Sequence, residues 1–107
     1  MNEHKTYTGY TNYETLTVAR WLKNDFGTYG YWHAVANKER EKAPDCWQVR
    51  QDIWPADKAA LFLLADRIKE DVTEGIPELD SGLYSQLLQA ALAEVDWHEV
   101  AQTLLDV

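Results

Sequence analysis

The sequence predicts an all-α protein, a compact bundle of about five helices joined by short loops. Three observations support this class. Apolar residues recur at spacings of three and four, Gly and Pro separate these segments, and no two segments alternate as paired strands do. With 107 residues, 46% of them hydrophobic, the chain can bury one core without a metal or a disulfide. We therefore expect one domain over residues 1–107, with residues 1–10 as a flexible N-terminal segment.

The first helix is predicted to begin near Asn12 and to end at Asn24 and Asp25. Thr11 and Glu14 have the spacing of a capping box, in which the Thr hydroxyl accepts from the Glu14 amide and the Glu carboxylate reaches back to the Thr11 amide. Apolar residues at helical spacing predict burial on more than one side of this helix: Leu16, Val18, Ala19, Trp21 and Leu22.

The second helix is expected to begin at Thr28 and to stop before Pro44. Its apolar stripe is Tyr31, Trp32, Val35 and Ala36, and its charged end, residues 38–42, is predicted to be solvated. Residues 45–54 fit a short helix and a short strand about equally, so we interpret them as a connector with one helical turn.

Three further features complete the expected bundle. Pro55 at a first helical position and Gly75 as a stop bound the clearest helix in the chain. The next helix is capped by Asp80 or Ser81, and the last opens with Asp96 and Glu99 as a second capping box. The residues expected to face the core are Leu61, Leu64, Ala65, Ile68, Val72, Leu83, Leu87, Leu88, Ala91, Leu92, Val95, Trp97, Val100, Ala101, Leu104 and Leu105.

The composition excludes several classes of protein. The longest apolar run, residues 59–65, has seven residues and is too short to span a bilayer. The single Cys46 cannot form an internal disulfide, and no secretion signal is recognisable, so a cytoplasmic location is expected, in the host cell if a phage encodes the protein. The net charge of −8 disfavours direct binding of nucleic acid.

Catalytic and metal-binding patterns are absent from the sequence. His4, His33 and His98 lie far apart and show no metal-ligand spacing, and the five glycines form no phosphate-binding loop. Cys46 has no base at a spacing that suggests activation. We expect no enzymatic activity, no metal, no cofactor and no small-molecule ligand.

The charges are distributed unevenly along the chain. Residues 1–69 contain nine acidic residues and all ten basic ones, whereas residues 70–107 contain nine acidic residues and no Lys or Arg. Acidic residues at the end of a helix, as at Glu70 to Glu74, oppose the helix dipole. This pattern fits either an acidic protein whose charge only prevents aggregation or a negative face that docks onto a basic groove.

The opening of the first helix carries a resemblance to a known family. The motif Asn-Tyr-Glu-Thr at residues 12–15 is followed by Val18, Trp21, Leu22, Asn24 and Asp25. With these residues and with segments 64–69 and 87–97, the chain resembles a family of small acidic proteins from phages, plasmids and bacterial genomes. The resemblance breaks down over residues 38–54, and Leu16 stands where members commonly have Trp. It implies a setting rather than a reaction, because small acidic proteins on mobile elements often inhibit host defence, including CRISPR and restriction systems.

These observations predict a non-enzymatic inhibitor of the anti-CRISPR or anti-defence type. Its partner would be a protein with a basic groove that holds nucleic acid, such as a CRISPR effector subunit, and binding would block nucleic-acid access. The candidate partner-binding residues are Glu70, Asp71, Glu74, Glu78, Asp80, Glu94, Asp96 and Glu99. Asp96 and Glu99 are also candidates for a helix cap.

Two other functions remain open from the sequence. A regulatory or scaffolding module could bind a protein through an aromatic surface, for which the candidates are Tyr7, Tyr10, Tyr29 and Trp32. An enzyme could assemble a site from distant residues, and a pocket that places His33 or His98 against Glu14 would favour it.

Overall fold

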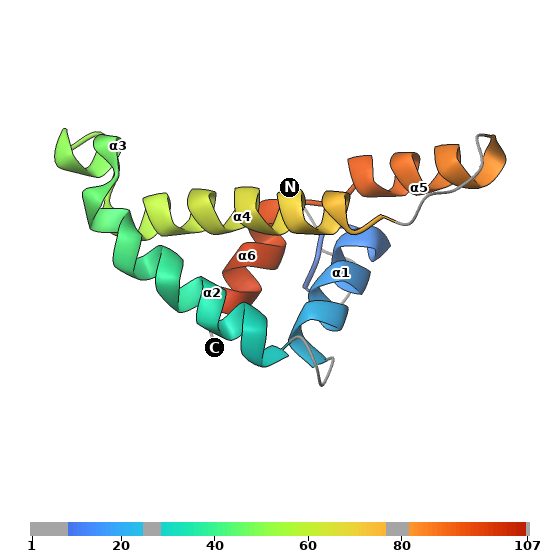
Figure 1. Ribbon diagram of the computed structural model, residues 1–107, viewed down its shortest axis with the longest axis horizontal. Helices are drawn as coiled ribbons and strands as arrows, with labels where there is room; N and C mark the ends of the chain where they lie inside the picture. The colour runs from blue at the N-terminus through green and yellow to red at the C-terminus, as the bar shows by residue number, and fades with distance from the viewer. Residues whose placement is uncertain (1–8, 25–28, 77–81, 107) are drawn as a thin grey trace.

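The computed structural model confirms the all-α class (Figure 1). It describes residues 9–24, 29–76 and 82–106. In these ranges the helices are α1 (Tyr13–Asn24), α2 (Tyr29–Lys42), α3 (Trp47–Arg50), α4 (Ala56–Glu74), α5 (Leu83–Ala93) and α6 (Trp97–Leu105), with a 3-10 turn, η1, at Ala43–Asp45. Thr28, predicted to cap the second helix, lies outside the described residues, as do Asp80 and Ser81.

Helix α6 is the centre of the fold. It packs against α4, α1 and α2, while α2 also packs along α4, so that α6 lies among the three longest helices (Figure 1). The buried residues of this core are Ala19, Leu22, Trp32, Val35, Ala36, Leu64, Ala65, Ile68, Val95, Val100, Ala101, Leu104 and Leu105. The predicted inward face of the last helix is therefore confirmed.

The connector between α2 and α4 is helical, as interpreted from the sequence. Pro44 lies in the first turn of η1, and α3 supplies the single helical turn. A second, small cluster of buried alanines, Ala43, Ala59 and Ala60, holds η1 against the start of α4. Pro55 is the residue before α4 rather than its first residue, and Gly75 follows its end as expected.

Several predictions about burial in α1 and α2 are wrong, including the place of Tyr31 in the apolar stripe, because Tyr31 is 49% exposed. Trp21 is 65% exposed rather than buried, because only the side of α1 that carries Ala19 and Leu22 packs against the core. Glu39, expected in a solvated charged end, is 4% exposed. Its carboxylate lies 3.5 Å from the Lys42 ammonium and 3.7 Å from the Arg67 guanidinium, and these two cations compensate for its burial.

Helix α5 is the largest departure from the predicted bundle. Leu83 and Leu87 were expected to face the core, yet they are 67% and 56% exposed, and α5 has no buried residue. The helix extends beyond the C-terminal end of α4, away from α2 and α3 (Figure 1). Leu92 near its C-terminal end packs against the core cluster. Amphipathic spacing was read correctly as a helix, but the surface needed to cover its apolar face is not supplied by the described part of the chain.

Candidate functional site

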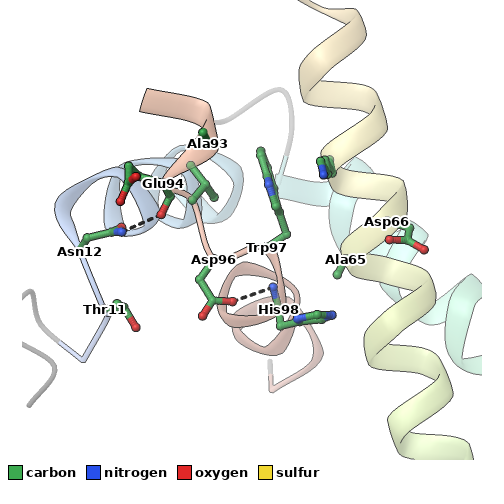
Figure 2. Close-up of a pocket in the computed structure, with 11 residues that line it drawn as sticks. Thr11, Asn12, Ala65, Asp66, Ala93, Glu94, Asp96, Trp97 and His98 are labelled. Carbon is green, nitrogen blue, oxygen red and sulfur yellow. Dashed lines mark hydrogen bonds between the residues drawn. The ribbon is translucent and has the colours of Figure 1, made fainter. Parts of the chain in front are cut away.

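Two adjoining hollows gather carboxylates from α4 and from the turn between α5 and α6. The first, of about 530 Å³, is lined by Asp66 and Lys69 of α4 and by residues 93–98, including Glu94 and Asp96 (Figure 2). The second, of about 400 Å³, lies over α4 and is lined by Asp66, Lys69, Glu70, Thr73 and Glu74. Because the hollows share Asp66 and Lys69, five acidic residues border one continuous region. We call this region the acidic surface: Asp66, Glu70, Glu74, Glu94 and Asp96.

The α4 part of the acidic surface is a helical stripe. Asp66, Glu70 and Glu74 are spaced by four residues and so lie on one side of the helix. All three are exposed. Lys69, one residue before Glu70, is the cation that lines both hollows. Asp66 was missed as a candidate because it belongs to the charge-balanced part of the sequence, although its spacing from Glu70 and Glu74 could have revealed it.

Trp97 is the aromatic residue that lines the first hollow. In Figure 2 the Trp97 ring stands between α4, which carries Asp66, and the α5–α6 turn, which carries Glu94 and Asp96. The ring also packs against the core cluster. The first hollow is therefore lined by one aromatic residue and by acidic residues from two elements.

The start of α1 fixes the α5–α6 turn in place. The Asn12 side-chain amide donates to the backbone oxygen of Glu94 at 2.6 Å (Figure 2). The hydroxyl of Thr15, which has no exposed surface, donates to Asn12 Oδ1 at 2.6 Å and accepts from the Asp96 backbone N–H at 2.8 Å. We call this set, with the Thr11 and Glu99 contacts described next, the α1–α6 clasp.

The predicted capping box of Thr11 and Glu14 is wrong. Asn12 caps α1, because its Oδ1 accepts from the Thr15 backbone N–H at 2.8 Å. Thr11 instead donates its backbone N–H and its hydroxyl to the two carboxylate oxygens of Glu99, at 2.9 and 2.6 Å. Glu99 thus ties the segment before α1 to α6 across 88 positions of sequence.

Asp96 is the N-cap of α6 as predicted, but the reciprocal half of the predicted capping box with Glu99 is wrong, because the Asp96 backbone N–H donates to the Thr15 hydroxyl. Asp96 Oδ1 accepts from the backbone N–H group of His98 at 3.1 Å (Figure 2) and from that of Glu99 at 3.2 Å. One carboxylate oxygen is therefore committed to the cap, although Asp96 still lines the first hollow.

Asp71 belongs to a network of ion pairs and hydrogen bonds on the adjacent side of α4. Its Oδ2 lies 3.6 Å from Arg67 Nε and 3.3 Å from the Tyr31 hydroxyl. Arg67 also contacts Glu39 and donates to the Tyr31 hydroxyl at 3.4 Å. The hydrogen bond with Tyr31 and the charges of Asp71 and Glu39 raise the pKa of Arg67, so the guanidinium stays charged throughout the usual pH range.

The structure therefore separates the eight candidate residues into three groups. Glu70, Glu74 and Glu94 are exposed and border the acidic surface. Asp71, Asp96 and Glu99 have internal partners, and of these Asp96 also lines a hollow. Glu78 and Asp80 lie outside the described residues.

The aromatic surface expected for the alternative function is not formed by the residues that the structure describes. Trp32 is 5% exposed in the core, and the Tyr10 hydroxyl hydrogen-bonds Thr103 Oγ1 at 2.7 Å. Tyr7 and the side chain of Tyr29 lie outside the described part. Exposed aromatic rings occur elsewhere, at Tyr13 (58%) and Trp21 (65%) on α1.

The pairing of a histidine with Glu14 that would favour an enzyme is not seen around the first hollow. His98 lines the first hollow and its ring packs edge-on against Phe62, with centroids 4.6 Å apart, whereas Glu14 is not among the residues around this hollow. His4 lies outside the described residues. Within residues 9–24, 29–76 and 82–106, no three His, Cys, Asp or Glu side chains are grouped as metal ligands would be.

Comparisons of the chain with protein-family models, with curated proteins and with solved structures found no match. In the described part of the chain, no helix has both the length and the apolar character needed to cross a bilayer.

Proposed function

We propose that this protein is a non-enzymatic inhibitor that binds the basic, nucleic-acid-holding groove of a host complex and blocks access of nucleic acid. The observation that supports the proposal is that five acidic residues, from α4 and the α5–α6 turn, line two hollows that share Asp66 and Lys69. The anti-CRISPR or anti-defence setting, and the origin from a phage or mobile element, rest on the resemblance of the α1 motif.

The physical basis is competition for cations. Lysines and arginines that contact phosphates in such a groove would instead contact Asp66, Glu70, Glu74 and Glu94, whose carboxylates have the same sign as phosphate. Opposite charges steer association, so binding should be fast at low salt and should weaken as ions screen it. Trp97 offers an apolar contact between the carboxylates and so adds a salt-insensitive part to the affinity.

The test is inhibition of nucleic-acid binding by purified CRISPR effector and restriction complexes, measured by gel shift. The variant reverses three exposed carboxylates, Glu70→Lys, Glu74→Lys and Glu94→Lys. We expect it to lose at least tenfold in inhibition of the complex that the wild type inhibits, and we expect added salt to weaken the wild type.

The matched control reverses three exposed acids away from the acidic surface, Glu41→Lys, Asp45→Lys and Asp57→Lys. Both triple variants have the same net charge. The control should retain inhibition. Equal loss in both variants would attribute the effect to net charge, and no inhibition of any complex by the wild type would refute the proposal.

A protein-binding module with an aromatic surface is the second candidate. The exposed rings of Tyr13 and Trp21, eight residues apart and on one side of α1, favour it. Trp21→Ala separates the two functions, because it should abolish partner binding through α1 and leave binding through the acidic surface nearly unchanged.

A further inference from the structure

Helix α5 carries an exposed apolar stripe. Leu83, Tyr84 and Leu87 are 67%, 74% and 56% exposed, and Ala90 is exposed on the same side. Leu88 and Leu92 lie on the opposite side, where Leu92 contacts the core. No residue of α5 is charged. A soluble helix normally presents charges on its outer face, so an uncharged outer stripe indicates a contact surface.

The stripe changes in size along the helix. Its N-terminal half carries the large side chains Leu83, Tyr84 and Leu87, and its C-terminal half carries the small side chains Ala90 and Ala91. Two such stripes in antiparallel orientation place large residues of one helix opposite small residues of the other. This alternation lets helix axes approach closely and fills the space between them.

We propose that α5 is a self-association surface, on which a second copy of this chain packs through its own α5 in antiparallel orientation. The arrangement is a two-fold symmetric dimer in which Leu87 lies next to the axis and meets Leu87 of the second copy. Leu83 then lies beside the second copy's Ala90 and Ala91. A parallel pairing would set large residues against large ones and small against small, which leaves the C-terminal halves poorly filled.

The net charge of the molecule favours a contact through an uncharged helix. Two copies of net charge −8 repel each other, and α5 is the one α-helix in the described part of the chain that adds no charged residue of its own to a contact. Salt screens this repulsion, so it should strengthen the dimer. The acidic surface should respond in the opposite way when it binds a basic partner, and the two interactions can therefore be told apart.

The exposed area sets the expected affinity. The exposed fractions of Leu83, Tyr84 and Leu87, 67%, 74% and 56%, correspond together to about 400 Å². Interfaces of stable complexes bury about 800 Å² on each partner. The α5 contact is roughly half of that size, so we expect a reversible dimer that forms at micromolar to millimolar protein concentration rather than a permanent one.

The first experiment is sedimentation velocity of the full chain over a wide concentration range, at low and at high salt. The wild type should shift from monomer to dimer with concentration, and at lower concentration when salt is added. Leu87→Glu places two like charges beside the axis and should raise the dissociation constant at least tenfold. Gln89→Glu adds the same charge off the stripe and should change it by less than about threefold.

The second experiment tests the orientation with single cysteines in a Cys46→Ser background under mild oxidation. Leu87→Cys should form a disulfide-linked dimer rapidly. Leu83→Cys should cross-link with Ala91→Cys in a mixed sample and much more slowly with itself.

Three results would overturn the proposal. The first is a wild type that remains monomeric at every protein concentration and salt concentration. The second is a Leu87→Glu variant that dimerises as strongly as the wild type. The third is a Leu83→Cys variant that cross-links with itself fastest, which would show a parallel pair. Circular dichroism of each variant confirms that the fold is retained, and neither experiment depends on the proposed inhibitory function.

Discussion

Replacing Thr15 by Val tests the α1–α6 clasp with the smallest change of shape. Val retains the size of the side chain but removes the hydroxyl, which donates to Asn12 Oδ1 and accepts from the Asp96 backbone N–H. Thr15 has no exposed surface, so water cannot easily replace these bonds. We expect the variant to fold and to be markedly less stable.

The magnitude follows from the two bonds. Asp96 loses the acceptor for its backbone N–H, and a buried donor left without a partner costs about 1–3 kcal/mol. The Asn12 oxygen keeps the Thr15 backbone N–H, so loss of the hydroxyl there costs only about 0.5–1.5 kcal/mol. Together these give a loss of about 1.5–4.5 kcal/mol and, for a domain of this size, a fall in Tm of roughly 6 °C or more.

The assay is urea unfolding followed by circular dichroism, with Thr17→Val as the control. Thr17→Val is the same chemical change on the same helix. The Thr17 hydroxyl donates to the Tyr13 backbone oxygen at 2.8 Å, and this hydrogen bond is exposed to solvent. The control should change the free energy of unfolding by less than about 0.5 kcal/mol. If Thr15→Val costs no more than Thr17→Val, the clasp does not hold α1 to α6.

Three further predictions concern α4, its ion pairs and the packing of the helices. Glu74→Lys should stabilise the fold by about 0.3–1 kcal/mol in urea unfolding, because the last turn of α4 has no basic residue to complement the helix dipole. A loss of stability would contradict the idea that the acidic residue at this helix end lowers the stability of the fold. Arg67→Met should cost about 1–3 kcal/mol, since it leaves the buried Glu39 with Lys42 alone, whereas Arg50→Met at an exposed position should be near neutral; equal effects would refute this role. Leu104→Ala should cost about 2–5 kcal/mol by opening the core, and Leu87→Ala at low protein concentration should cost less than about 0.5 kcal/mol; a large loss for the α5 variant would show that α5 packs inward.

The acidic surface was only partly predictable from the sequence. The run without Lys or Arg after residue 69 drew attention to Glu70, Glu74 and Glu94, and these three are exposed around the hollows. Asp71 has the same charge and lies one position from Glu70, yet it faces Arg67 and Tyr31. Neighbouring residues on a helix point in directions about 100° apart, so charge along the sequence does not show which carboxylates share a surface.

The sequence by itself determined the helices and most of their ends, because helix formation and capping depend on contacts within about four residues. Asp96 caps α6 from its own first turn for this reason. Only the tertiary structure decided that Thr11 bonds Glu99 rather than Glu14, that Glu39 is buried and that Leu83 and Leu87 of α5 are exposed. Each of these outcomes depends on which surface, distant in sequence, competes for the same group, and local spacing carries no information about such a competitor.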